Sequence, residues 1–235
     1  MARFFETVDL LLRNPSGVLT RVHRGSDVRD LPLQLTLISA AGLGAFGLMF
    51  GLSRSMLWGL IAAPKLVLVA LGTVALCLPA LYVCGRLMGS NSSPIEVVCE
   101  VLVAMASAAL TLIALCPVWL VFAGLAGRSP WGYFHVMLGA VALLGLAGAR
   151  GAWILMRGLL ANGRPVAHLT MWMLLYAAVG IQAAWVTRPF VGNPASRDGN
   201  AIFRPLEGSA FDATRTLIES NLDVLNGHVD PTGAE

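Results

Sequence analysis

The long middle part of this chain has almost no acidic residues. Between Leu31 and Thr187 the only carboxylates are Glu96 and Glu100, and the whole chain has a single lysine, Lys65. Charged residues make up 12% of the chain and hydrophobic residues 57%, whereas a soluble domain has about 25% charged residues. A water-soluble surface of this size needs many more carboxylates. The sequence therefore predicts an all-α polytopic membrane protein.

Catalytic and metal-binding motifs are also missing. The sequence has no HExxH, no GxSxG, no phosphate-binding glycine loop and no CxxC pair. A bis-histidine haem is not expected, because His135 is predicted near the outer face of the membrane and His168 near the inner face. We interpret the cysteines as small packing residues within apolar runs: Cys77, Cys84, Cys99 and Cys116. We therefore expect no enzymatic activity, no metal, no cofactor and no nucleic-acid partner.

Five apolar segments are long enough to cross a hydrocarbon core of about 30 Å. They run from about 31 to 52, 66 to 85, 101 to 125, 131 to 149 or a little beyond, and 169 to 187. A second helix that began at Met56 would be about 45 Å long, so we expect Pro64 to break it. Residues 56–64 would then form a short interfacial helix or, alternatively, a re-entrant segment.

The distribution of arginines predicts the orientation in the membrane. With five spans, nine arginines fall on one side: Arg3, Arg13, Arg21, Arg24, Arg29, Arg86, Arg150, Arg157 and Arg164. The loops on the other side hold only Arg54, Lys65 and Arg128. The N-terminus is therefore predicted to be cytoplasmic and the C-terminus outside. We expect no cleavable signal peptide, because the first long apolar run begins about thirty residues into the chain.

An amphipathic helix is predicted at each end of the chain. Phe4, Val8, Leu11 and Leu12 recur at helical spacing within residues 3–13, as in a helix that lies on the inner membrane surface or binds a partner. Asn14 and Pro15 predict a stop followed by a new helix.

In the tail, Ser209 and Asp212 resemble a capping box, and the apolar residues that follow share one face. We therefore divide the chain into a cytoplasmic arm (1–30), a transmembrane domain (31–190) and an extracytoplasmic tail (191–235) with an acidic amphipathic helix. This helix would pack on the outer mouth of the bundle or, alternatively, dock on a partner.

Polar side chains inside or beside the spans are the candidate functional residues, because such groups are costly in a membrane. The candidates are Lys65, Arg86, Glu96, Glu100, Gln182 and Arg188.

The two carboxylates lie one turn apart. Ser93, Pro94 and Glu96 have the spacing of a capping box at a helix start. Glu100 lies on the same face and is expected to pair with Arg86 across the hairpin. The alternative is a cation or proton site made from both carboxylates.

The remaining candidates lie toward the outer side. Lys65 is near the start of the second span, where the helix dipole disfavours a cation. It would snorkel to the headgroups or, alternatively, meet a lipid phosphate or an anionic substrate. Arg188 is expected to complete the last span before Pro189, with a binding role as the alternative. Gln182, like Thr73, would hydrogen-bond between helices or line a pore.

Small residues recur at spacings that favour close helix packing. These residues are Gly44, Gly47 and Gly51 in the first span, Gly145 and Ala149 in the fourth, and Gly180, Ala184 and Thr187 in the fifth. The pattern does not distinguish packing within a protomer from packing between protomers.

The arm sequence LLRNPSGVLTRVHRG, which leads into five spans, resembles the Yip family of small multipass membrane proteins. The strings APKLVLVALGTVALCLPALYV and GIQAAWVTRPFVGNP are similar to those of a group of bacterial membrane proteins near that family. The resemblance implies a bacterial inner-membrane protein that organises the membrane, takes part in trafficking or supports a transporter. It carries over no functional residues, and the acidic tail departs from it.

Two functions follow from these features. The first is a non-enzymatic scaffold or accessory subunit, whose partners are the lipid bilayer and other membrane proteins or further copies of itself. The alternative is a small oligomeric channel or transporter whose path uses Glu100, Lys65 or Gln182.

Overall fold

The computed structural model describes residues 2–23, 30–89, 91–126, 130–161 and 166–187. These residues form seven α-helices and no β-strand. The helices are α1 (Ala2–Arg13), α2 (Pro15–His23), α3 (Leu31–Leu52), α4 (Met56–Leu87), α5 (Pro94–Ala126), α6 (Pro130–Ala161) and α7 (Val166–Thr187). The tail helix and Arg188 fall outside the described residues.

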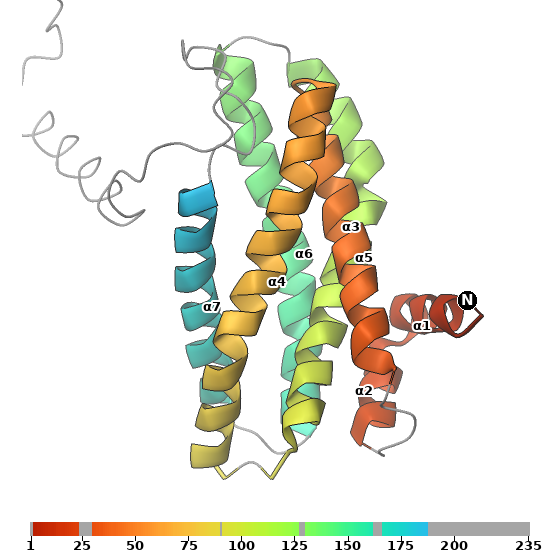
Figure 1. The fold of residues 1–235 in the computed structure, drawn as a ribbon, viewed down its shortest axis with the longest axis vertical. Coiled ribbons are helices and arrows are strands. Elements are labelled where there is room, and N and C mark those ends of the chain that lie inside the picture. Colours follow the sequence, from red (N-terminus) through yellow and green to blue (C-terminus); the bar gives the residue numbers. More distant parts are fainter. Residues whose placement is uncertain (1, 24–29, 90, 127–129, 162–165, 188–235) are drawn as a thin grey trace, which may run out of the picture.

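The five long helices run up and down along one bundle axis (Figure 1). Each of α3 to α7 is long and apolar enough to cross a membrane, which confirms the predicted all-α polytopic fold. The turn between α3 and α4 lies at one end of the bundle, and the turn between α4 and α5 lies at the other. Because five spans reverse direction four times, α3 begins and α7 ends toward opposite ends.

The predicted helix break at Pro64 is wrong. α4 continues unbroken from Met56 to Leu87, with Pro64 and Pro79 inside it. Proline removes one helical hydrogen bond, but this part of α4 is held against α3. A Cβ atom at Gly47 would lie 2.9 Å from the Cα atom of Ala63, so the two backbones are almost in contact. Residues 56–64 are thus the first turns of α4, neither a separate interfacial helix nor a re-entrant segment.

The third and fourth spans belong to helices longer than predicted. α5 starts at Pro94 rather than near residue 101, and α6 continues to Ala161 rather than ending near residue 149. Charged residues suggested the predicted limits, but a charge ends the apolar part of a span without ending its helix. Apolar runs therefore predict the membrane-crossing segments better than they predict the ends of the helices.

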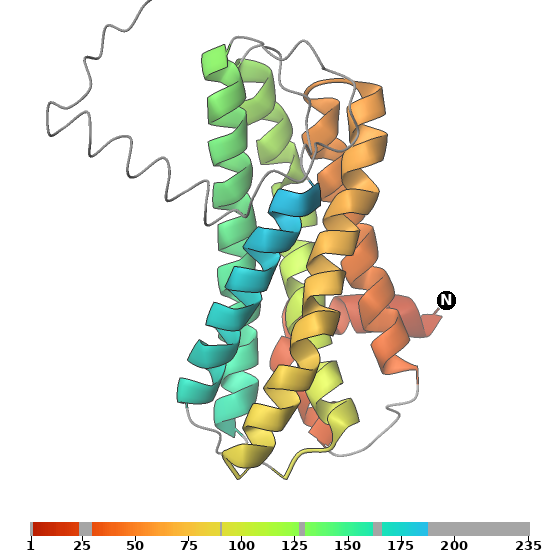
Figure 2. The ribbon, with the colours of Figure 1, turned by 60° about the vertical axis from the view of Figure 1, so that its left-hand side comes forward.

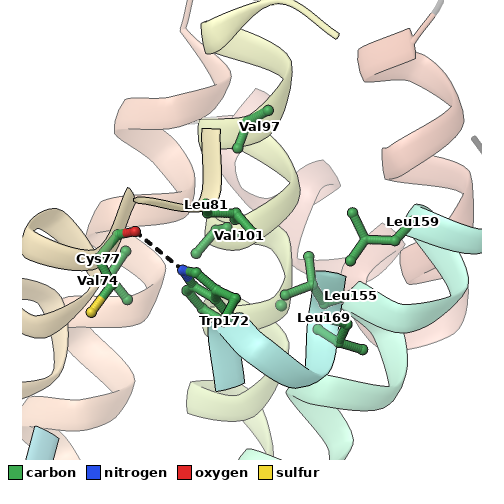
Figure 3. Packing of buried hydrophobic residues seen from close by; sticks show 10 residues of the cluster. Val74, Cys77, Leu81, Val97, Val101, Leu155, Leu159, Leu169 and Trp172 are labelled. Carbon is green, nitrogen blue, oxygen red and sulfur yellow. Dashed lines mark hydrogen bonds between the residues drawn. The ribbon is translucent and has the colours of Figure 1, made fainter. Parts of the chain in front are cut away.

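Helix α5 is the centre of the bundle and contributes to three apolar clusters. The first joins α3, α5 and α6 around Phe46 and Trp119. The second joins the four helices α4, α5, α6 and α7 around Trp172, as Figure 3 shows. The third joins α1 and α2 to α3, α5 and α6 around Leu11 and Val103.

The N-terminal arm folds as two short helices, as predicted. Asn14 separates them, and its Oδ1 atom accepts a hydrogen bond from Gly17 N at 3.0 Å. α1 lies across the long axis of the bundle (Figure 1), where Thr7 Oγ1 donates to Gln34 Oε1 at 2.8 Å. Leu11 is buried against the bundle, whereas Leu12, which was also predicted on the apolar face, is exposed. The apolar face of α1 therefore packs on protein, and its contact with a membrane surface stays a prediction.

Candidate functional site

The described candidate residues separate into two groups. Lys65 and Gln182 belong to the paired helices α4 and α7 on the side where α7 ends. Arg86, Glu96 and Glu100 flank the turn between α4 and α5, at the other end of the bundle. The candidates therefore do not form one site, and the α4–α7 pair is described first.

Lys65 is buried and interacts with the end of α7. Its side chain is 5% exposed, and its Nζ atom donates a hydrogen bond to the carbonyl oxygen of Thr187 at 2.9 Å. Thr187 is the last residue of α7, where the carbonyl groups lack helical partners and carry a partial negative charge. The lysine that is unfavourably placed in its own helix is thus favourably placed at the C-terminus of a neighbouring one.

A tryptophan near the opposite end of α7 makes a second polar contact with α4. Trp172 Nε1 donates to the carbonyl oxygen of Cys77 at 3.3 Å (Figure 3), and its ring stacks on that of Tyr176 with centroids 5.3 Å apart. Figure 2 shows α7 lying beside α4. Lys65 and Trp172 therefore fix the height of α7 along α4.

An apolar groove of about 460 Å³ lies between the two helices. It is lined by Leu68, Val69, Gly72, Thr73, Leu76, Val179, Gln182, Ala183, Val186 and Thr187. Leu68 and Leu76 are largely exposed, so the groove opens on the outside of the bundle. The residue that receives the Lys65 hydrogen bond, Thr187, forms one end of the groove.

Thr73 lines this groove, but its hydroxyl oxygen is buried. The side chain is 2% exposed, and its Oγ1 atom has no hydrogen-bond partner among the described residues. Ser39, Thr111 and Thr187 each bond to a carbonyl one turn earlier in their own helix at 2.8 Å, whereas Ser107 Oγ, like Thr73 Oγ1, has no partner within the described part of the chain. A buried hydroxyl without a partner costs about 1–3 kcal/mol.

At the other end of the bundle, the predicted capping box is confirmed. Glu96 Oε2 accepts a hydrogen bond from Ser93 N at 3.0 Å, and Ser93 Oγ accepts one from Glu96 N at 3.4 Å. Glu100 is completely buried, whereas Arg86 is exposed. The predicted ion pair between Arg86 and Glu100 stays a prediction.

Three glycines hold α3, α4, α5 and α6 close together. A Cβ atom at Gly42 would lie 2.8 Å from Ala109 Cβ in α5, and one at Gly51 would lie 2.5 Å from Gly59 Cα in α4. A Cβ atom at Gly151 in α6 would lie 3.0 Å from the Ala104 carbonyl oxygen. The small residues of the first span are therefore used within the protomer.

The small-residue face of α6 is different. A Cβ atom at Gly145 or at Gly148 would meet nothing within 4 Å, and Ala142 and Ala149 are exposed beside them. The predicted close packing through Gly145 and Ala149 is therefore not made within the described part of this chain.

The structure also contains polar contacts that sequence reasoning missed. Trp119 Nε1 donates to the Met49 carbonyl oxygen in the last turn of α3 at 3.3 Å, much as Lys65 does at the end of α7. A tryptophan in an apolar run is normally interpreted as a core residue. Nothing in the neighbouring sequence identifies the carbonyl group that accepts its hydrogen bond. No family model, curated protein or solved structure matches this chain.

Proposed function

We propose that the chain is a non-enzymatic scaffold or accessory subunit of a larger membrane complex in the bacterial inner membrane, with its N-terminus in the cytoplasm. The observation that carries this proposal is the open face of α6, formed by Ala142, Gly145, Gly148 and Ala149. The Yip-like resemblance and the distribution of arginines support its location and orientation.

The physical reason lies in how helices associate in lipid. Apolar side chains gain little by leaving lipid for protein, so helices associate mainly through close van der Waals contact. Small residues allow that contact, as Gly42 and Gly151 do inside the bundle. The α6 face has the same character and an exposed surface, and therefore suits a helix from another chain.

The channel alternative has less support. Apolar clusters pack the described bundle near both ends and around α5. The large apolar groove lies on its outside, between α4 and α7. A conducting path would need Glu100 or Lys65 along it, and replacing them by Gln and Met should then abolish flux in liposomes.

Native mass spectrometry of the full chain, gently extracted from its own membrane, tests the scaffold proposal. We expect the wild-type chain to retain a second polypeptide and Gly145→Leu to lose it. The matched control is Gly124→Leu in α5, because a Cβ atom at Gly124 also meets nothing within 4 Å. This control should keep the partner.

A retained partner of different mass would identify a complex subunit, and a second copy would identify self-association through the same face. A monomer in the wild-type sample, or equal behaviour of the two leucine variants, would refute the role of the α6 face.

A further inference from the structure

Two arginines and a tryptophan form a cationic surface on the second half of α6. Arg150, Trp153 and Arg157 follow one another at spacings of three and four residues, which places them on successive turns of one side of the helix. All three are exposed, and the exposed fraction of Trp153 is 52%. The guanidinium carbon of Arg157 lies over the Trp153 ring, 5.0 Å from the ring centroid. This cation–π contact orients the guanidinium group.

The positive charge of this surface is not neutralised by a neighbouring carboxylate. α6 contains no Asp or Glu residue, and within the described part of the chain neither Arg150 nor Arg157 forms an ion pair or a hydrogen bond. The acids of α1, Glu6 and Asp9, each form an ion pair with an arginine of the arm. Because contact with an aromatic face uses none of the N–H donors of a guanidinium group, Arg157 keeps them for an anion.

The surface lies at the height where α3 begins. Ile154, the residue after Trp153, packs in the cluster that contains Leu11 of α1 and Leu35 near the start of α3. α3 has 22 residues, or about 33 Å, so its ends lie near the two edges of a hydrocarbon core of about 30 Å. α1 lies across the bundle at the same height (Figure 1). Trp153 is therefore placed at one edge of the core, where tryptophans are enriched and the lipid headgroups begin.

We propose that Arg150, Trp153 and Arg157 bind the headgroup of one anionic phospholipid, in the leaflet on the side of the N-terminal arm. Guanidinium groups bind phosphate oxygens through paired N–H donors, and two of them match a lipid with a net negative charge. Leu146, one turn from Arg150 toward the middle of the membrane, is 61% exposed and offers an apolar surface to an acyl chain. A free phosphate would gain nothing from that apolar surface.

The site is separate from the proposed contact of α6 with a partner helix. At about 100° per residue, Arg150 and Arg157 lie roughly 120–180° around the helix from Gly145 and Gly148. Gly145→Leu, which should lose the protein partner, should therefore keep the lipid. The lipid site and the partner contact can each fail without the other.

The test uses the full chain in phosphatidylcholine nanodiscs that contain photoactivatable phosphatidylglycerol or, in a separate sample, photoactivatable phosphatidylcholine. After illumination and proteolysis, mass spectrometry measures how much lipid is attached to the peptide that contains position 153. We expect phosphatidylglycerol to attach there clearly more than phosphatidylcholine. An excess of inorganic phosphate should not displace it.

Three substitutions measure the contribution of each side chain. Arg150→Gln and Arg157→Gln should each lower the preference for phosphatidylglycerol about fivefold, which is the effect of one basic residue at an anionic membrane surface. Trp153→Leu should lower it about two- to fivefold, because the Arg157 guanidinium loses the ring that orients it. All three side chains are exposed, so the variants are expected to fold, and an unchanged Tm checks this.

Arg86→Gln is the matched control for a general effect of charge. Arg86 is also exposed and lies near the end of α4 on the same side of the bundle, and its replacement should leave the preference at position 153 unchanged. The proposal is overturned if Arg86→Gln has as large an effect as Arg157→Gln. It is also overturned if both lipids attach equally to the wild-type protein, or if inorganic phosphate displaces the lipid.

Discussion

Replacing Gly42 by alanine should loosen the contact between α3 and α5. The added Cβ atom would lie 2.8 Å from both the Cβ atom and the carbonyl oxygen of Ala109. Carbon atoms in packed interiors are about 3.5–4.0 Å apart, so the helices must separate by roughly 0.7 Å. A gap of that size loses about a quarter to a half of the dispersion energy of each affected contact.

The expected change in stability follows from two opposing effects. Overpacking costs about 1–3 kcal/mol, and the better helix propensity of alanine returns up to about 1 kcal/mol. With that return subtracted in full, the net loss is up to about 2 kcal/mol, which lowers the Tm by up to about 8 °C for a chain of this size. A thiol-reactive dye can measure this loss, because Cys77 and Cys99 are buried and free in the folded protein.

Gly44→Ala is the matched control in the same helix. Its Cβ atom would lie 3.6 Å from Val67 Cγ2, which is an ordinary contact, so we expect the Tm to stay the same or rise slightly. If Gly42→Ala melts at the same temperature as Gly44→Ala, then α3 and α5 are not as close as described and the argument from glycine contacts fails.

Two further substitutions test single polar contacts. Trp172→Phe removes the hydrogen bond to Cys77 and should cost about 1 kcal/mol; hydrogen exchange should become faster in the first half of α7, and unchanged exchange there would count against the contact. Ser93→Ala removes the cap of α5 and should also cost about 1 kcal/mol. Exchange should become faster in the first turn of α5 only, with Ser93→Thr as the control, and uniform exchange along α5 would contradict a local capping role.

The features predicted correctly from the sequence depend on nearby residues. The five spans follow from long apolar runs, and the capping box follows from Ser93 and Glu96 three positions apart. The contacts that define the α4–α7 site connect distant positions. Lys65 and Thr187 are 122 residues apart, and Cys77 and Trp172 are 95 residues apart. No spacing rule predicts such pairs, because they depend on which helices become neighbours.

The wrong prediction at Pro64 has the same cause. A proline in a helix is unfavourable when that helix is considered alone, and the sequence around it shows nothing that offsets this cost. The offset comes from α3, where Gly47 brings the two backbones together at Ala62 and Ala63.

Lys65 shows how a contact with a second helix can make an electrostatically unfavourable position favourable. Judged within α4, a cation one third of the way along an apolar helix opposes the helix dipole. In the bundle, α7 ends beside it, and its final carbonyl group accepts the hydrogen bond. From the sequence we expect Arg188, the next residue along the chain, to lie at the C-terminus of α7. Within the described residues, the hydrogen bond to the final carbonyl group of α7 comes from Lys65 on the neighbouring helix α4. The same side chain therefore holds the end of α7 against α4.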